Sequence, residues 1–275
     1  MEYFQDLKIS DSDFQQMVSF IQENYGIDLS KKRQLVVSRL SHSLKTRGYA
    51  NFRQFLDQLL SKKDPDDLRL VLDKLTTNYT YFMRESEQFD FLQKAILPDL
   101  VARHQRDRVL SIWSAGCSSG EEPYTISMAL KAFLGSQFSS WDTRILATDI
   151  SNQAMAKAKA ARYKKPSDVP SDWFRQFFRP IPGSNDEYTL VPEIRNNVIF
   201  RPFNLMSPIQ FRLKFDIIFC RNVMIYFNQP TRDALVRRFY NAMQPSSYLF
   251  ISRSESLGQN PLFRMLSPAI YQRVP

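Results

Sequence analysis

The sequence predicts an α/β domain that is preceded by an all-helical domain. Between residues 10 and 75, apolar residues recur at helical spacing. From Arg108 onward, short apolar runs alternate with amphipathic segments, which is the pattern of a mostly parallel sheet flanked by helices. The stretch 163–197 interrupts this alternation with five prolines and predicts a small antiparallel insertion.

Composition limits the classes of protein that fit. The chain has 275 residues, 43% of them hydrophobic and 24% charged, which suits one large domain or a medium and a small one. No apolar run is long enough to span a bilayer, and the N-terminal MEYFQDLKIS lacks the apolar core of a signal peptide. We therefore expect a cytoplasmic protein in which Cys117 and Cys220 are reduced thiols, with no metal site.

The net charge of +9, from 37 basic and 28 acidic residues, favours acidic partners. Nucleic acid, an anionic membrane and an acidic protein surface all meet this description, so composition leaves the choice open.

Four amphipathic helices are predicted in the first domain. The first begins after cap residues at Ser10 and ends at Gly26; the second is capped by Ser30 and ends at Gly48. A third follows, and the fourth begins after Asp64. Six Lys/Arg against one acid lie between residues 28 and 50, which indicates either a solvated helix face or a docking face for an acidic helical partner.

The stretch 75–85, LTTNYTYFMRE, departs from helical periodicity and is rich in hydroxyls and aromatic rings. A plain linker explains it, but linkers are seldom so aromatic. Asn78, Thr80 and Arg84 are each able to contact a polar ligand. A helix over 87–104 is expected next.

The second domain is organised around RVLSIWSAGCSSGEEPY, residues 108–124. An apolar run, a loop of small residues and a helix that opens at Glu121 predict backbone N–H groups facing a ligand at the sheet edge. Two carboxylates beside this loop would repel a pyrophosphate but suit hydroxyls, an ammonium group or a sulfonium. This favours S-adenosylmethionine over NAD or ATP, although an ordinary strand-to-helix turn explains the loop equally well.

Later strands are predicted to end in polar residues at the same edge. Asp149 ends one apolar run, where an acid accepts hydrogen bonds from ribose hydroxyls, and Asn204 ends the next. Arg221 and Asn222 follow a strand that is apolar on both faces. The remaining predicted elements are helices over 151–162 and 229–244, a strand over 248–252 and a closing hairpin over 265–274.

Six motifs occur in a fixed order: TTNYTYFMRE, IWSAGCSSGEEPY, ATDIS, FNL, FDIIFCRNVMIYF and SESL. With the basic segment GIDLSKKRQLVVSRLSHSLKTRGYANFRQFL, they closely resemble the CheR-type chemotaxis receptor methyltransferases over essentially the whole chain. The resemblance implies a helical domain (1–75), a linker contributing to the cofactor site (76–86) and a Rossmann-like class I methyltransferase domain (87–275) with a β-subdomain inserted at about 163–197.

The activity implied by the resemblance is methylation of glutamate side chains on the cytoplasmic helices of chemoreceptors. S-adenosylmethionine would be the donor, with a glutamate methyl ester and S-adenosylhomocysteine as products, which describes a protein-glutamate O-methyltransferase of chemotaxis adaptation. The expected partners are receptor cytoplasmic domains, with no nucleic acid and no membrane insertion, and the expected state is a monomer. In some family members the insertion binds a receptor C-terminal pentapeptide; whether this one does stays open.

Carried onto matching positions, the resemblance implies three sets of site residues. Arg84 and Tyr226 would lie closest to the transferred methyl group, and Lys32, Arg39 and Lys45 would dock the receptor. The implied cofactor-binding residues are Asn78, Thr80, Arg84, Gly116, Glu121, Asp149, Asn204, Leu205, Arg221 and Asn222. Met83 departs from the family's FFRE-like pattern, and Cys117 lies in the cofactor loop.

The chemistry fits the residues available. A glutamate side chain with a pKa of about 4.3 is already ionised at neutral pH and needs no general base, and the two histidines, His42 and His104, lie outside every motif. Transfer annihilates charge, so the protein's main contribution is positioning in a water-poor crevice. Arg84 suits a bidentate grip on a carboxylate, and the Tyr226 hydroxyl suits orienting the acceptor.

Two rival functions remain. A nucleic-acid methyltransferase acting on exocyclic amines would carry an Asn/Asp-Pro-Pro-aromatic motif where this chain has Cys-Arg-Asn-Val-Met. A non-enzymatic module that senses the cofactor is the second, and the intact Arg84, Asp149, Asn222 and Tyr226 argue against it.

Overall fold

The computed structural model describes residues 7–61 and 64–275. The start of the N-terminal segment on which the absence of a signal peptide was predicted, residues 1–6, lies outside this range. The chain divides into two compact units, one formed by the residues up to Thr77 with Tyr226–Asp233, the other by Asn78–Ile225 with Ala234–Pro275. No helix in the described part of the chain is long and apolar enough to cross a membrane.

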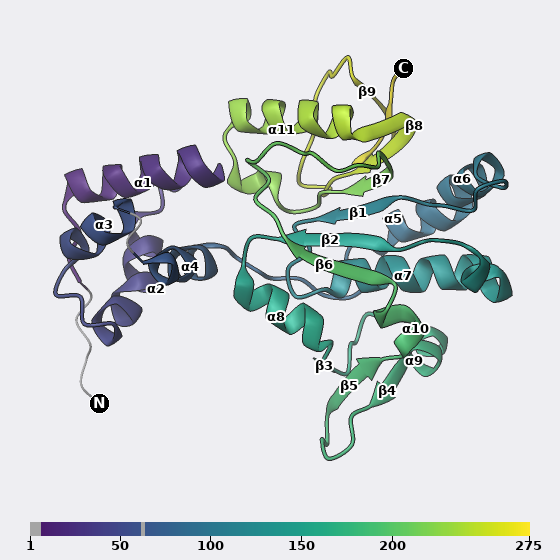
Figure 1. The fold of residues 1–275 in the computed structure, drawn as a ribbon, viewed down its shortest axis with the longest axis horizontal. Coiled ribbons are helices and arrows are strands. Elements are labelled where there is room, and N and C mark those ends of the chain that lie inside the picture. The colour runs from purple at the N-terminus through teal and green to yellow at the C-terminus, as the bar shows by residue number, and fades with distance from the viewer. Residues whose placement is uncertain (1–6, 62–63) are drawn as a thin grey trace. The chain divides into compact units, whose positions relative to one another are not determined.

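The first unit consists of helices α1 (Asp11–Tyr25), α2 (Arg33–Thr46), α3 (Phe52–Leu60) and α4 (Pro65–Leu75) (Figure 1). As predicted, the Ser10 side chain caps α1 by accepting the Asp13 N–H, and Gly26 ends it with φ +74°. The predicted cap at Ser30 is wrong. Its N–H and hydroxyl both bond to the Asp28 carboxylate, so Ser30 is held in a turn before α2, which begins without a side-chain cap.

A seven-stranded sheet in the order β6-β2-β1-β7-β8-β10-β9 forms the centre of the second unit. The strands from β6 to β8 are parallel, and β8, β10 and β9 pair antiparallel. The chain order reverses beside β1, which is where open α/β sheets bind ligands. The strands are β1 (Ile112–Ala115), β2 (Ile145–Asp149), β6 (Val198–Pro202), β7 (Phe215–Phe219), β8 (Met243–Phe250), β9 (Phe263–Ser267) and β10 (Ile270–Arg273).

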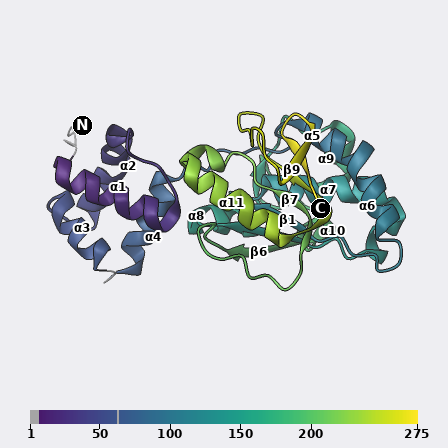
Figure 2. The same ribbon diagram turned by 90° about the horizontal axis from the view of Figure 1, so that it is seen from above.

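Helices cover both faces of this sheet (Figures 1 and 2). Strand β1 shows why, because Ile112 belongs to the core cluster that includes Met128 of α7, whereas Trp113 packs edge-to-face on Phe239 of α11. The helices are α5 (Ser86–Phe91) continuing through a π-helical turn (Leu92–Ile96) into α6 (Leu97–Arg103), α7 (Glu121–Leu134), α8 (Asn152–Ala160) and α11 (Gln229–Ala242), with 3₁₀ turns at Gly135–Ser140 and Met224–Tyr226.

The predicted insertion is a three-stranded antiparallel sheet in the order β3-β5-β4, formed by Tyr163–Lys164, Glu187–Leu190 and Phe178–Pro180 (Figure 1). It also contains two short helices that were not predicted, α9 (Ser171–Phe177) and α10 (Pro192–Arg195). Each follows a turn signal that the prolines provide, since Pro170 precedes α9 and Pro192 opens α10.

Two predicted boundaries near the C-terminus were wrong. The last long helix ends at Ala242 rather than at residue 244, and the strand expected over 248–252 already begins at Met243. The cause is tertiary, because Met243 pairs with Phe215 at the start of β7 and so enters the sheet early. The α/β class, the helical first domain and the antiparallel insertion are confirmed.

Candidate active site

The loop between β1 and α7 is shaped by two glycines at the carboxyl edge of the sheet. Gly116 has φ +91° and Gly120 has φ +98°. The N–H groups of Gly116 and Cys117 both donate to the Thr148 carbonyl, at 2.8 and 2.9 Å, which ties the loop to β2. A Cβ on Gly116 would lie 2.3 Å from Cγ2 of Val223, so only glycine fits against the loop that follows β7.

Asp149, predicted as the ribose ligand, is buried at the end of β2. Its Oδ2 accepts the Ser118 N–H at 2.8 Å and its Oδ1 accepts the Ser151 N–H at 2.9 Å. The carboxylate therefore joins the β1–α7 loop to the start of α8 and is fixed in place by both. Its carbonyl accepts the N–H of Phe203, which precedes Asn204.

The segment from Asn78 lies along this loop. The Asn78 amide donates to the Ser151 hydroxyl at 3.2 Å, and its carbonyl accepts the Ser118 hydroxyl at 2.9 Å. Further along, the Met83 N–H donates to the Thr125 hydroxyl of α7 at 3.3 Å. Half-buried Thr80 lies between these two anchors in the chain. The structure thus brings Asn78 and Asp149 together around Ser118 and Ser151, in and beside the loop that begins at Gly116.

Arg84 is a half-buried cation held against two aromatic rings. Its Nη1 donates to the Tyr79 carbonyl at 2.8 Å, and its guanidinium lies 5.9 Å from the Tyr79 ring centroid and 5.7 Å from that of Tyr81. Among the residues that the structure describes, no carboxylate forms an ion pair with it. Such an arginine is oriented by its neighbours and available to an anionic group from outside the protein.

The two glutamates that open α7 have different partners. Glu121 Oε2 accepts the Ser119 hydroxyl at 2.7 Å, so it belongs to the loop. Glu122 accepts the Ser114 hydroxyl at 2.7 Å and Nη1 of Arg221 at 3.2 Å. Burial raises the pKa of both carboxyls above the usual value, since desolvation disfavours their charged forms.

Arg221, predicted to bind the cofactor, has its guanidinium buried in an ion-pair network, with 2% of its side chain exposed. Nη1 pairs with Glu122, while Nη2 lies 3.5 Å from Oε2 of Glu85 and donates to the Arg84 carbonyl. The same group packs over the Phe89 ring of α5. The geometry therefore supports a positioning role for this side chain, and direct contact with a cofactor stays a prediction.

Three further predicted residues occupy loops at the sheet edge. Asn222 has φ +59°, and its amide donates to the Ser252 hydroxyl at 2.7 Å. Asn204 accepts the Met206 N–H at 2.9 Å, which forms the turn after β6. The carbonyl of Leu205 accepts Nη2 of Arg238 at 2.8 Å.

The other predicted residues belong to the first unit. The Tyr226 hydroxyl donates to the Thr77 carbonyl at 3.4 Å, and Nζ of Lys32 lies 5.4 Å from the centroid of its ring. Arg39 donates to the carbonyls of Lys74 and Thr76, at 3.2 and 3.4 Å, and so binds the C-terminal end of α4. Half-buried Lys45 lies in the last turn of α2.

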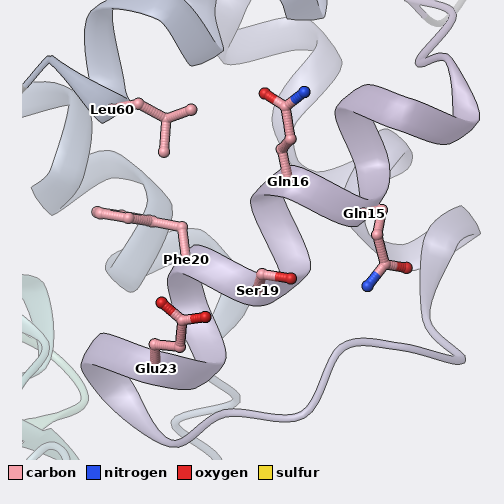
Figure 3. A pocket seen from close by; sticks show the side chains of 6 residues that line it. All are labelled: Gln15, Gln16, Ser19, Phe20, Glu23 and Leu60. Carbon is pink, nitrogen blue, oxygen red and sulfur yellow. The ribbon is translucent and has the colours of Figure 1, made fainter.

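A surface hollow of about 340 Å³ lies between α1 and α3 of the first unit (Figure 3). Polar side chains of α1 surround it, with Leu60 of α3 opposite Phe20. None of the predicted site residues lines it; the lining residues are Gln15, Gln16, Ser19, Phe20, Glu23 and Leu60.

Sequence reasoning missed the roles of the carboxylates that organise this edge of the sheet. It took Glu122 as one of two acids facing a ligand, whereas the structure pairs it with Arg221. Glu85 and Glu122 pair with Arg221, and Glu255 accepts the N–H groups of Asn222 and Ile225. Each lies in a motif that was noted, TTNYTYFMRE, GEEPY or SESL. The available signal was chemical: an arginine after a fully apolar strand needs buried acidic partners.

The polar groups of the site suit S-adenosylmethionine. Carboxylates at Glu121 and Asp149 match hydroxyl and ammonium groups, and the guanidinium of Arg84 matches a carboxylate. The loop also leads into the N-terminus of a 14-residue helix, but Glu121 and Glu122 in its first turn would repel a pyrophosphate there.

Comparison with known proteins identifies two family models along the chain. "CheR methyltransferase, all-alpha domain" matches residues 12–76, and "CheR methyltransferase, SAM binding domain" matches residues 78–271. The chemotaxis protein methyltransferase of Borreliella burgdorferi is 36% identical over 97% of this chain and 96% of its own length. That of Escherichia coli K12 is 34% identical over 91% of this chain and 86% of its own length.

A solved structure, the methyltransferase domain of bacterial-CtHen1-CN, is 14% identical and covers 58% of this chain and 64% of its own length, with a TM-score of 0.32. This likeness is too low to carry an argument about the present site.

Proposed function

The chain belongs to the CheR methyltransferase family, and from this premise we propose that it methylates glutamate side-chain carboxylates on the cytoplasmic helices of chemoreceptors. Its cofactor is S-adenosylmethionine. The products would be a glutamate methyl ester and S-adenosylhomocysteine. In the proposed division, residues 1–75 dock the receptor, 76–86 contribute to the cofactor site and 87–275 form the methyltransferase domain.

One observation carries the proposal: a half-buried arginine, Arg84, has no carboxylate partner among the described residues and follows a segment bonded to the Asp149 site through Asn78 and Ser118. An acceptor that is already anionic needs a positioned cation rather than a general base. Neither histidine belongs to this segment: His104 faces Asp107 and Asp216, and His42 is exposed on α2. A carboxylate acceptor fits this arrangement better than a hydroxyl, which would need a base.

When bound, S-adenosylmethionine supplies a methyl group on a sulfonium; attack by a carboxylate oxygen breaks the carbon–sulfur bond and leaves an ester and a thioether. The residues of this chain position the two reactants. Asp149 and Glu121 would hold hydroxyl or ammonium groups of the cofactor, and Arg84 would hold the acceptor carboxylate or the cofactor's own. Tyr226 is proposed to orient the acceptor.

The first test measures binding and transfer separately. Calorimetry with S-adenosylhomocysteine on the wild type and on Asp149→Ala should show a loss of affinity of at least tenfold, about 1.4 kcal/mol. Tritiated methyl label should then enter receptor cytoplasmic fragments as an alkali-labile ester. Unchanged affinity in Asp149→Ala would remove the ribose assignment, and alkali-stable label on RNA or DNA would favour the nucleic-acid rival.

A second test concerns the acceptor. Arg84→Met should lower transfer from saturating cofactor at least a hundredfold, because the acceptor carboxylate loses its charge-assisted hydrogen bonds. Arg103→Met is the matched control, since Arg103 also packs over a tyrosine ring but pairs with Asp99 on α6. Equal activity of the two variants would contradict the assigned role.

Receptor docking is proposed for Lys32, which precedes α2, and for Arg39 and Lys45 within α2. Charge reversal at Arg39 would also remove its hydrogen bonds to the end of α4, so Lys32→Glu is the cleaner variant. We expect it to raise the KM for receptor without changing cofactor affinity, whereas Lys94→Glu, on an exposed face of the second unit, should change neither. A receptor KM equal to the wild type's would remove Lys32 from the docking face.

We further propose that the protein works in the cytoplasm as a monomer, with methyl-accepting receptor domains as partners. The β-subdomain at 163–197 is the candidate site for a receptor C-terminal peptide. Titration of the full chain with such a pentapeptide, and with the same peptide truncated by its last residue, tests this directly.

A further inference from the structure

The carboxylate of Glu255 receives three backbone N–H donors. Oε2 accepts the N–H of Ser252 at 2.7 Å and of Asn222 at 3.2 Å, and Oε1 accepts the N–H of Ile225 at 3.1 Å. Only 8% of the residue is exposed. A buried carboxylate is tolerated where such donors replace the water molecules that would otherwise hydrate it. The hydrogen-bonding capacity of this side chain is therefore used by the surrounding backbone.

These bonds join two loops that are distant in sequence. Glu255 lies in the turn after β8, where its own N–H donates to the Ser252 carbonyl at 2.9 Å, while Asn222 and Ile225 lie in the loop after β7. Strands β7 and β8 are parallel neighbours, so both loops leave the sheet at the same edge. The carboxylate of Glu255, in the turn after β8, therefore fixes the loop after β7.

The loop after β7 needs such an anchor. Asn222 has φ +59°, a conformation that disfavours an ordinary side chain, and a single 3₁₀ turn follows it at Met224–Tyr226. Its N–H groups at Asn222 and Ile225 have Glu255 as acceptor. Without that acceptor both N–H groups would lose the hydrogen-bond partner that holds this loop conformation in place.

What the anchor positions is Val223. A Cβ on Gly116 would lie 2.3 Å from Cγ2 of Val223, so the loop after β7 is seated directly against the loop between β1 and α7. A second connection runs through Ser252, whose hydroxyl accepts the Asn222 amide at 2.7 Å and donates to Oε1 of Glu85 at 2.8 Å. The loops held by Glu255 therefore keep Val223 packed against Gly116.

We propose that Glu255 is a positioning residue for S-adenosylmethionine: it fixes residues 222–225 and, through the packing of Val223 on Gly116, the position of the loop between β1 and α7 that the cofactor binds. The inference rests on the proposed location of the cofactor at Gly116 and Asp149. It assigns a function to the SESL motif, residues 254–257.

The test uses the full chain with Glu255→Gln, which keeps the shape but turns one acceptor oxygen into a donor facing an N–H group. We expect the dissociation constants of S-adenosylmethionine and S-adenosylhomocysteine to rise at least tenfold. The KM for the cofactor should rise with them, while kcat at saturating cofactor stays within about twofold. A merely structural residue would not give this split between KM and kcat.

Asp216→Asn is the matched control. Asp216 is 2% exposed, lies at the opposite end of β7, and accepts the Ser111 N–H at 2.9 Å. It should lose stability like Glu255→Gln but bind the cofactor as the wild type does. Weakened binding by Asp216→Asn to the same degree, or wild-type affinity in Glu255→Gln, would overturn the proposal.

Glu255→Asp covers the case in which the glutamine variant does not fold. It keeps the charge but is one methylene shorter, so its cofactor affinity should lie between those of the wild type and of a variant without the carboxylate; wild-type affinity would refute the positioning role. Failure of the proposed cofactor location appears differently, as wild-type-like binding by Asp149→Ala.

Discussion

Substituting Gly116 by alanine tests how tightly the cofactor loop is enclosed. The added Cβ would lie 2.3 Å from Cγ2 of Val223, and 3.6 and 3.7 Å from its Cβ and Cγ1. Two costs follow. A non-glycine residue at φ +91° costs about 1–3 kcal/mol in backbone strain, and the overlap adds about 1–3 kcal/mol of overpacking. Gly116→Ala should therefore lose roughly 2–6 kcal/mol of unfolding free energy.

The two costs are separable by experiment. Gly48→Ala is a control for strain alone, since Gly48 has φ +83° and no atom lies within 4 Å of the position that its Cβ would take. Val223→Ala combined with Gly116→Ala removes the overlap and should recover about 1–3 kcal/mol. Urea unfolding measures each variant, and calorimetry with S-adenosylhomocysteine measures binding, which only the Gly116 variants should weaken.

A Gly116→Ala protein no less stable than Gly48→Ala, with unchanged ligand affinity, would refute the reasoning. It would mean that Val223 moves aside freely. The loop after β7 would then not hold the loop between β1 and α7 in place, and the positioning role proposed for Glu255 would lose its basis as well.

Four further predictions concern charged residues. Arg221→Met leaves Glu85 and Glu122 without their buried cation and should cost about 3–5 kcal/mol in urea unfolding; a loss below about 1 kcal/mol would show the network to be dispensable. Burial raises the pKa of Glu121 above 4.5, so its carboxylate becomes protonated and neutral as pH falls through that raised pKa. Affinity for S-adenosylmethionine should decline over the same pH range in the wild type but not in Glu121→Gln. The raised pKa also makes stability depend on pH. The stabilising contribution of Glu121 is complete below pH 4.5 and is lost as pH rises through the raised pKa. The free energies of unfolding at pH 5 and pH 8 should therefore differ less in Glu121→Gln than in the wild type. Arg39→Gln should cost about 1–2 kcal/mol through α4, and Lys32→Gln should cost less than about 0.5, both by thermal unfolding; equal losses would contradict the role of Arg39 at the end of α4.

Local signals in the sequence were sufficient for the architecture. Ser10 and Gly26 delimit α1 as expected because a cap and a left-handed glycine act within a few residues of the helix end. The strand, small-residue loop and helix at 108–124 likewise form from neighbours in the chain. Where a competing local bond existed, as between Asp28 and Ser30, the prediction of the cap failed.

Long-range pairing was beyond such signals. Arg221 follows a strand and precedes a polar residue, so the sequence suggested a ligand contact. Its partner Glu122 lies 99 positions earlier, and the Glu85 pairing spans a still longer distance along the chain. Only the assembled sheet brings Arg221, which follows β7, to Glu122 in the first turn of α7. The location of Asp149 was easier to predict, because ligands bind at the carboxyl ends of the strands in open parallel sheets, and Asp149 is the last residue of its strand.

The motif CRNVMIYF joins two sets of contacts that do not overlap. Its first part, residues 221–225, is held by Glu122 and Glu255 within the second unit, while the carbonyl of Tyr226 accepts the Asp28 N–H within the first. Substitutions at Glu255 are therefore expected to shift residues 222–225, which pack on the cofactor loop through Val223. Substitutions near Asp28 are expected to shift the segment that carries Tyr226. If Tyr226 orients the acceptor as proposed, substitutions at Glu255 should change cofactor affinity, whereas substitutions near Asp28 should change methyl transfer.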